Sequence, residues 1–181
     1  PATPRCHRPG SHRPCTPPDF VKGKSQAGER GDMVVEFDWT VGQVMKKLKE
    51  LGIEQNTLLI ISSDNGATKT SDDGKDYGHK SCGNLHGYKS ALHEGGHRVP
   101  FIVKWPKVVK PGTKTNELVS IMDIYATVSD ILGAKKPEGD GTSFLQILKN
   151  PNAASKRTQM VHHTYSGNFA LRYSNWKFIP N

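Results

Sequence analysis

Residues 56–66, NTLLIISSDNG, decide the fold class predicted for this chain. The run from Leu58 to Ile61 is apolar without interruption, as in strands that are buried on both faces of a parallel sheet. Polar residues and a glycine end the run. In α/β folds, ligands bind just past the carboxyl ends of the strands, where Asp64 and Asn65 stand in this sequence. We therefore expect this strand to lead into a ligand site.

The residues ahead of this strand predict an amphipathic helix that begins near Asp38. Gly52 stands where a C-terminal cap is expected, and lysines separate the apolar positions. A helix, a buried strand and a polar loop in succession make one α/β unit. The apolar residues that recur at helical spacing are Val41, Val44, Met45, Leu48 and Leu51.

Further elements are predicted after the strand. Residues 66–97 show neither helix nor strand period, and such a long polar stretch indicates a functional loop. A second strand is predicted within residues 98–106, RVPFIVKWP, where prolines mark entry and stop. Helices are predicted over 120–133, with Ser120 as N-cap and Gly133 as terminator, and over 143–148. Residues 160–179 predict antiparallel strands, and the stripe of the helix over 120–133 consists of Ile124, Val128, Ile131 and Leu132.

The composition favours a globular chain with anionic ligands. Among its 181 residues are 25 Lys+Arg against 17 Asp+Glu, a formal net charge of +8. Charge alone does not choose between sulfated or phosphorylated molecules, nucleic acid and acidic polysaccharide. No apolar run approaches the ~20 residues that a membrane span needs. The three cysteines form no C-x-x-C pair, so neither a zinc ribbon nor a dense disulfide framework is indicated.

The segment His93-Glu94-Gly95-Gly96-His97 fits the zinc-protease pattern H-E-x-x-H. That pattern works on one face of a helix, where both histidines reach a zinc ion and the glutamate acts as general base. Two adjacent glycines cost a helix interior roughly 2 kcal/mol relative to alanine, and a proline follows within a few residues. The local sequence therefore predicts a turn and argues against a zinc protease.

Asp64 and Asn65 supply hard oxygen ligands, a carboxylate and an amide carbonyl, which suit Ca²⁺ or Mg²⁺. Asp-Asn-Gly is also an ordinary turn sequence, and this reading stays open. Lys89 lies in a glycine-rich loop and can pair with an oxyanion held by the same metal, although a lone lysine is usually a solvated surface group.

These two segments together resemble the sulfatase family, whose members carry S-D-N-G after a core strand, then G-x-K, four further residues and E-G-G-x-R-x-P-F. Residues 23–66 resemble the family's helix ahead of the metal strand, and residues 140–148 and 169–179 resemble its closing helix and the start of its small C-terminal sheet. The match covers most of the chain from His12 onward. The paired motif consists of Ser63-Asp64-Asn65-Gly66, Gly87-Tyr88-Lys89, Glu94-Gly95-Gly96, Arg98, Pro100 and Phe101.

The resemblance implies roles for particular residues. Asp64 and Asn65 match two ligands of the family's single divalent cation, usually Ca²⁺, with Mg²⁺ as the other candidate. Lys89 matches the lysine that contacts the sulfate ester and stabilises charge as the S–O bond breaks. His12 matches a substrate-contacting histidine, a candidate proton donor to the leaving alcohol, and its alternative is a histidine of a basic tail.

The resemblance also implies a scaffold. Glu94 and Arg98 would order the loop that presents Lys89, while His93 and His97 would be variable positions. The fold expected is α/β, an alkaline-phosphatase-like mixed sheet flanked by helices, with the beginning of a small C-terminal antiparallel sheet. Residues 1–19 would be an irregular segment, residues 20–150 the C-terminal part of the catalytic domain, and residues 151–181 the start of the small subdomain.

The chain departs from the family pattern at its nucleophile. Sulfatases carry a C-x-P-S-R-type motif whose cysteine is oxidised to formylglycine, and this sequence has none. Residues 15–19 lack the Ser and Arg and stand on the wrong side of the chain order, so we reject Cys15 as nucleophile. The family's adjacent Asp-Asp metal ligands are also missing. We expect the chain to be the C-terminal part of a sulfatase, inactive alone, with formylglycine only in the part that precedes it.

Three functions fit this sequence. The first is hydrolysis of sulfate esters of small molecules or polysaccharides. The second keeps the fold but cleaves a phosphodiester or phosphonate, and the third is a non-catalytic binder of anionic polysaccharide. We find no aromatic platforms interleaved with basic residues, so nucleic acid is not expected as a partner, and neither is a membrane. The family suggests a periplasmic or extracellular location, while the oligomeric state and the particular ester are open.

Overall fold

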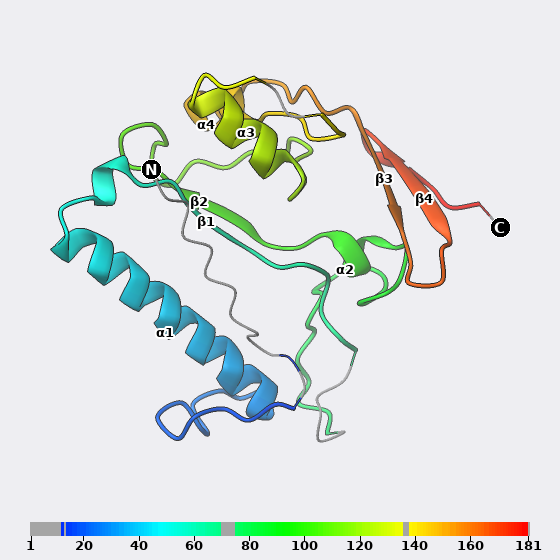
Figure 1. Ribbon diagram of the computed structural model, residues 1–181. Helices are drawn as coiled ribbons and strands as arrows, with labels where there is room; N and C mark the ends of the chain where they lie inside the picture. Colours follow the sequence, from blue (N-terminus) through cyan, green and yellow to red (C-terminus); the bar gives the residue numbers. More distant parts are fainter. Residues whose placement is uncertain (1–11, 13, 70–74, 136–137, 181) are drawn as a thin grey trace. The chain divides into compact units, whose positions relative to one another are not determined.

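The computed structural model describes residues 12, 14–69, 75–135 and 138–180. These residues divide into two compact units, one within 12–54 and 68–84 and the other within 55–67 and 85–180. Figure 1 shows the helices and strands of both units in sequence colours. The domain boundaries predicted after residues 19 and 150 stay predictions, and most of the irregular segment predicted over residues 1–19 lies outside the described residues.

The first unit is built around α1 (Gly28–Glu50). This helix begins well before Asp38, so the predicted start was wrong. The side chain of Asp32 is 3% exposed and accepts hydrogen bonds from the backbone N–H groups of Gly23 and Ser25, each at 2.7 Å. A carboxylate that accepts backbone N–H groups of a preceding loop fixes that loop against the helix. The first turns of α1 are thus stabilised by contacts with the loop seven to nine residues earlier, which helical periodicity does not reveal.

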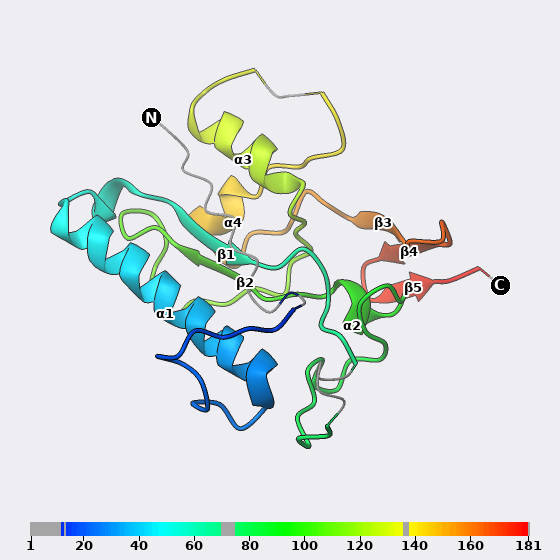
Figure 2. The same cartoon turned by 60° about the horizontal axis from the view of Figure 1, so that its bottom comes forward.

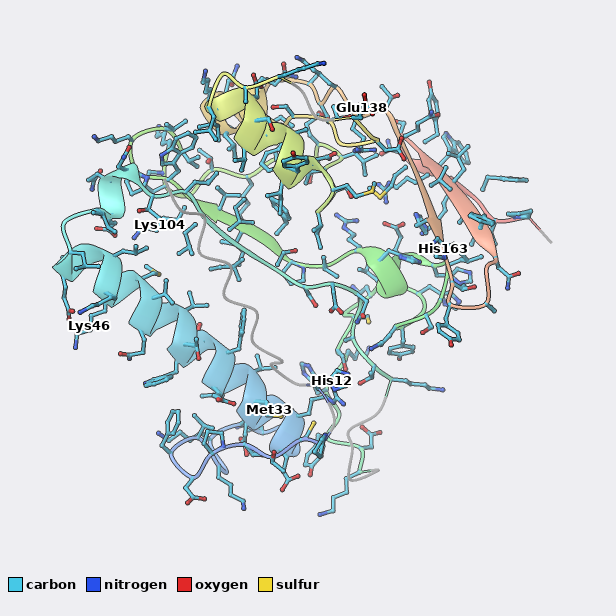
Figure 3. All side chains as sticks on the ribbon, in the orientation of Figure 1. His12, Met33, Lys46, Lys104, Glu138 and His163 are labelled. Carbon is cyan, nitrogen blue, oxygen red and sulfur yellow. The ribbon has the colours of Figure 1, made fainter. Side chains whose placement is uncertain are left out.

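The predicted end of α1 is confirmed. Gly52 adopts φ +67°, and its N–H donates to the carbonyl of Lys49 at 3.0 Å, as a glycine after a helix end should. The N–H of Ile53 donates to the carbonyl of Leu48 at 3.1 Å. Near the other end, the rings of Phe20 and Trp39 lie 4.9 Å apart, so the segment before the helix packs against it. Figure 3 labels Met33, one of the buried residues of this helix.

The second unit contains the predicted core strand as β1 (Leu59–Ser62) and the second strand as β2 (Phe101–Lys104). The two strands pair antiparallel, with Ser62 opposite Phe101. All four residues of β1 are half-buried. The expectation of a parallel-type strand buried on both faces was therefore wrong for the described residues, because a continuous apolar run reports burial but not the direction of the neighbouring strand.

Two further helices of this unit pack on this pair. They are α3 (Asp123–Ile131) and α4 (Leu145–Lys149), close to the predicted positions. The rings of Phe144 and Phe101 meet edge to face with their centroids 5.6 Å apart. The buried cluster of Phe144, Ile147 and Leu148 is surrounded by Leu58, Ile60, Phe101, Val103, Trp105, Val109, Val119 and Ile124. This hydrophobic cluster thus joins β1 and β2 to α3 and α4.

The predicted apolar stripe of α3 was wrong in part, because Leu132 is 61% exposed while Asp123 and Thr127 are each 1% exposed. Asp123 accepts hydrogen bonds from the backbone N–H groups of Ser120 and Thr142, each at 2.8 Å, and pairs with Arg157. The hydroxyl of Thr127 accepts from the N–H of Phe144 at 3.0 Å. Two hydrogen-bonded polar residues, Asp123 and Thr127, therefore lie on the inward face of α3, where the sequence pattern predicts aliphatic residues.

The C-terminal sheet is the predicted antiparallel one, with β3 (Gln159–His163), β4 (Phe169–Tyr173) and β5 (Trp176–Phe178) in the order β3-β4-β5. Figure 2 shows these strands near α2 (Glu94–His97). Alternation along the register puts His162, Ala170, Arg172 and Lys177 on one face. The opposite face is exposed and carries Val161, Phe169, Tyr173, Trp176 and Phe178, together with His163, which Figure 3 labels.

Candidate functional site

The turn that follows β1 carries the two predicted metal ligands. The hydroxyl of Ser63 donates to the carbonyl of Asn65 at 3.1 Å, and the side-chain amide of Asn65 donates to the carbonyl of Gly66 at 3.0 Å. This second bond uses the donor end of the Asn65 side chain and leaves its oxygen as an acceptor. Asp64 is exposed and Asn65 is half-buried. The turn therefore carries a carboxylate and an amide oxygen at consecutive positions.

Backbone hydrogen bonds tie this turn to the loop that carries Lys89. The N–H of Lys89 donates to the carbonyl of Ala67 at 2.8 Å, and the N–H of Gly66 donates to the carbonyl of Gly96 at 2.9 Å. The side chain of Lys89 is exposed. The structure thus brings the predicted ligands and the predicted sulfate-contacting lysine into one set of bonded loops.

Three glycines explain how closely these loops approach. A Cβ atom at Gly66 would overlap the carbonyl oxygen of Gly95, and one at Gly95 would overlap the carbonyl oxygen of Gly87. A Cβ atom at Gly96 would overlap the carbonyl oxygen of Ala91. Because the close neighbours are backbone atoms, they cannot move aside as a flexible side chain would. The two glycines of the H-E-G-G-H segment are required for this packing.

The H-E-G-G-H segment itself forms α2, a single helical turn over Glu94–His97, so the predicted non-helical turn was wrong for these four residues. His93 precedes the helix with extended backbone, φ −71° and ψ 164°. Its ring lies 4.3 Å from that of His86, whereas the ring of His97 lies 4.1 Å from that of His162. The two histidines of the motif therefore face different partners. The described residues contain no group of three or more His, Cys, Asp or Glu placed to hold a metal ion.

Glu94 forms ion pairs with two cations of the C-terminal sheet. Its carboxylate forms an ion pair with Arg172 of β4 and accepts a hydrogen bond from Nζ of Lys177 of β5 at 3.0 Å. Burial works to raise the pKa of Glu94, but the hydrogen bond and charge of Lys177 and the charge of Arg172 outweigh it and lower that pKa. A carboxylate with a lowered pKa and with both oxygens bonded to cations is a poor proton acceptor, so it is unsuited to the general-base role that a zinc protease would require.

His162 of β3 also reaches the loop, because its Nε2 lies 3.3 Å from the carbonyl oxygen of Leu92. Burial and the charge of Lys177 lower the pKa of His162 to about 4, and the same two causes lower the pKa of His97. Arg172, Lys177 and His162 were missed by sequence reasoning. Their alternation in the strands gives no sign of which loop they contact.

The other predicted site residues, Arg98 and His12, are exposed. The backbone N–H of Arg98 donates to the carbonyl of Glu94 at 2.7 Å, and its side chain is exposed. His12 is exposed and belongs to the first unit, whereas Asp64, Asn65, Lys89, Glu94 and Arg98 belong to the second. Figure 3 labels His12. Cys15 is 6% exposed, and its thiol lies 3.9 Å from the carbonyl oxygen of His12, an environment unlike that of an accessible nucleophile.

The donor set at the turn after β1 fits a hard divalent cation in its chemistry. A carboxylate and an amide oxygen on one turn match the oxygen ligands that Ca²⁺ and Mg²⁺ take. Two protein ligands are fewer than the six to eight oxygens of a complete Ca²⁺ shell. Further ligands from water, substrate or other protein groups are therefore needed to complete the coordination.

Comparison with known proteins defines the family. The sequence profile of the Sulfatase family matches residues 2–134. A match over this share of the chain shows that it belongs to the sulfatase family, and the resemblance seen in the S-D-N-G and E-G-G-x-R-x-P-F segments is confirmed.

Individual relatives agree with this assignment. The chain is 36% identical over 178 residues to the N-acetylgalactosamine-6-O-sulfatase of Bacteroides thetaiotaomicron, a match that covers 93% of this chain and 34% of the relative. It is 38% identical over 177 residues to human steryl-sulfatase, covering 90% of this chain and 30% of that protein. The chain therefore spans about a third of the length of the curated relatives it matches.

A solved structure from Bacteroides thetaiotaomicron, described in work on the metabolism of multiple glycosaminoglycans, superposes with a TM-score of 0.86. Its sequence is 35% identical, and the match covers 93% of this chain and 36% of that one. The predicted α/β class of the alkaline-phosphatase-like sulfatases is confirmed, with part of the fold present here. In the described part of the chain, no helix is both long and apolar enough to cross a membrane.

Proposed function

We propose that this chain supplies one part of the active site of a sulfuric ester hydrolase. The observation that carries the proposal is the pair of backbone bonds, Lys89 to Ala67 and Gly66 to Gly96, that joins the lysine loop to the Asp64-Asn65 turn. With the two loops bonded, an oxyanion bound by a cation at the turn would lie within the field of the lysine.

Asp64 and Asn65 would hold a Ca²⁺ or Mg²⁺ ion, which when bound polarises the sulfate oxygens. Lys89 would donate to a sulfate oxygen and stabilise the charge that develops as the S–O bond breaks. Glu94 and Arg98 would order the loop around Lys89, and the ion pairs of Glu94 support this role. The role of His12 as proton donor to the leaving alcohol stays a prediction from the family resemblance, because His12 belongs to the other unit.

The nucleophile is assigned to no residue of this chain. A formylglycine would have to come from a C-x-P-S-R-type motif, which this sequence lacks. The substrate we propose is a sulfated small molecule or polysaccharide, in keeping with the amino-sugar sulfatase that the chain resembles and with its net charge of +8. A periplasmic or extracellular location would bring the protein to such substrates.

The test is a chimera in which residues 12–180 replace the matching third of the Bacteroides N-acetylgalactosamine-6-O-sulfatase. After circular dichroism confirms folding, hydrolysis of p-nitrophenyl sulfate and of N-acetylgalactosamine 6-sulfate is assayed with Ca²⁺. We expect activity, and we expect Lys89→Ala to lower kcat by roughly 100-fold or more. The matched control is Lys107→Ala, an exposed lysine of the same unit that has no place in the proposed site.

Three outcomes would contradict the proposal. A folded chimera whose activity is unchanged by Lys89→Ala would remove Lys89 from the site. Preferential cleavage of p-nitrophenyl phosphonate esters would favour the phosphonate alternative. An inactive chimera, combined with salt-sensitive binding of the 181-residue chain to a sulfated polysaccharide that Asp64→Ala leaves unchanged, would favour a non-catalytic binder.

A further inference from the structure

Two cations stand directly opposite each other on the C-terminal sheet. The register pairs Arg172 of β4 with Lys177 of β5, so both side chains lie on the same face. Like charges directly opposite each other destabilise a sheet. Here the carboxylate of Glu94 lies between them, with one oxygen bonded to each cation. The negative charge of Glu94 therefore offsets the repulsion between Arg172 and Lys177, and the two cations in turn stabilise the Glu94 carboxylate.

This cluster differs from an ordinary surface ion pair in its burial. The side chain of Lys177 is 14% exposed, and those of Arg172 and Glu94 are 25% and 26% exposed. Partly buried charges are screened less by solvent than surface pairs and are held in defined positions. By contrast, the Lys47–Glu50 pair of α1 has side chains that are 67% and 49% exposed.

The same face of the sheet holds the loop at two further points. His162 contacts the carbonyl of Leu92, and its ring packs on that of His97 at 4.1 Å. The contacts with Leu92, Glu94 and His97 lie before, at the start of and at the end of α2. Figure 1 shows α2 beside the C-terminal strands. The helical turn is therefore held along its whole length by one face of the sheet.

Backbone hydrogen bonds connect α2 to the lysine loop and to the turn after β1. The N–H of Gly95 donates to the carbonyl of His86 at 2.8 Å, and the carbonyl of Gly96 accepts from Gly66 at 2.9 Å. The contacts of Gly95 with Gly87 and of Gly96 with Ala91 leave no space for a side chain. A shift of α2 would therefore displace both the segment that leads into Lys89 and the turn of Asp64 and Asn65.

We propose that Arg172 and Lys177 are positioning residues of the site, acting through Glu94 to fix the backbone that presents Lys89. The C-terminal sheet thereby sets the geometry of the anion-binding loop without contacting the anion. The role of Lys89 in binding an anion rests on the proposed function. The structural coupling between the sheet and the lysine loop does not depend on it.

The experiment follows the backbone amides of Lys89 and Gly66 by hydrogen exchange in the 181-residue chain. Lys177→Met and Arg172→Met should each accelerate exchange at these two amides by about tenfold, because the loop opens locally when Glu94 loses a partner. Lys177→Arg keeps the charge and should restore slow exchange. If either methionine variant does not fold, Glu94→Gln tests the same coupling, because it removes the charge that pairs with Arg172 and Lys177. It should also accelerate exchange at the amides of Lys89 and Gly66.

The matched control is Arg157→Met, which breaks the buried pair with Asp123 in the same unit and removes the same charge. It should lower global stability without a selective effect on the amides of Lys89 and Gly66. If Lys177→Met changes these amides no more than Arg157→Met does, or if Lys177→Arg fails to restore them, the positioning role is excluded.

A second readout separates this inference from the proposed function. Binding of inorganic sulfate to the chain, measured with Ca²⁺ by calorimetry, should be lost in Lys89→Ala and weakened about tenfold in Lys177→Met. If the wild-type chain binds no sulfate while the exchange effects appear, the proposed role of Lys89 fails and the link from the sheet stands. If sulfate binds, but Lys177→Met changes neither the amide exchange at Lys89 and Gly66 nor the affinity for sulfate, the positioning role is excluded and the proposed function stands.

Discussion

The N–H of Lys89 donates a hydrogen bond to the carbonyl oxygen of Ala67 at 2.8 Å. This bond joins two segments that an intervening loop of the other unit separates in the sequence. The lysine loop is therefore held by backbone contacts with the turn that carries Asp64 and Asn65. Substitutions that disturb these contacts should damage the site without altering any candidate ligand.

Gly66→Ala should destabilise the second unit by about 1–3 kcal/mol, because the new methyl group would overlap the carbonyl oxygen of Gly95. Urea denaturation measures the change in the free energy of unfolding. The control is Gly42→Ala in α1, where nothing lies within 4 Å and alanine favours the helix, so stability should rise by about 0.5–1 kcal/mol. Equal stabilities for Gly66→Ala and wild type would show that the loops are not packed as described.

Arg157→Met should cost about 3–5 kcal/mol of unfolding free energy. Asp123 is 1% exposed and would be left as a buried charge, although it would keep the N–H groups of Ser120 and Thr142. Lys47→Met, which breaks an exposed pair with Glu50, should change stability by less than about 0.5 kcal/mol. Similar losses for the two variants in thermal or urea unfolding would contradict the importance given to burial.

Acidification should weaken the second unit between about pH 6.5 and pH 4. Burial and the charge of Lys177 depress the pKa of His162 from 6.5 to about 4, so the unfolded chain takes up a proton that the folded chain resists. Stability from this group is complete above pH 6.5 and is lost as the pH falls to 4. The groups that face it are Lys177, His97 and Glu94.

The measurement is a series of urea unfolding curves over this pH range for wild type and His162→Gln. The variant should show a flatter dependence of unfolding free energy on pH. His163→Gln, on the exposed face of the same strand, should follow the wild-type curve. A variant curve at position 162 that runs parallel to wild type would rule out His162 as the origin of the acid sensitivity.

Asp32→Asn should loosen the loop before α1, because an amide is a weaker acceptor than a carboxylate for the N–H groups of Gly23 and Ser25. We expect a loss of about 1–3 kcal/mol in the first unit. Burial acts to raise the pKa of Asp32, but the backbone hydrogen bonds from Gly23 and Ser25 lower it overall, so this stability should be lost as the pH falls below about 3.8. Faster exchange of the Gly23 and Ser25 amides would report the effect, and unchanged exchange would contradict it.

Much of the fold could be predicted from local pattern. Gly52 marked the end of α1, prolines bounded β2, and the turn residues of 160–179 separated the C-terminal strands. The start of α1 could not be predicted, because it depends on the buried contacts of Asp32. The inward face of α3 was missed for the same reason, since Asp123 is buried only because Arg157 and two backbone N–H groups satisfy it.

The site was predictable to the extent that a motif encodes it. Family resemblance proposes Asp64, Asn65, Lys89, Glu94 and Arg98 as residues of the candidate site, and these five lie in one unit. His12, proposed on the same ground, belongs to the other unit. The motif did not indicate that Glu94 binds Arg172 and Lys177, because the partners of a charged residue are set by long-range topology. The single turn of α2 was also missed, since tertiary contacts of its glycines outweigh their poor helix propensity.

The antiparallel pairing of β1 with β2 has a consequence for folding. The turn after β1 and the lysine loop both lie, in the sequence, between the two strands of this short pair. The entropy of closing a loop must be lost before the contacts at its neck are gained, and long-range pairing is slow compared with helix formation. We therefore expect the segment that carries Asp64 and Lys89 to acquire its shape only after two distant strands have met, so the rate of that encounter would limit how fast the candidate site forms on a newly made chain.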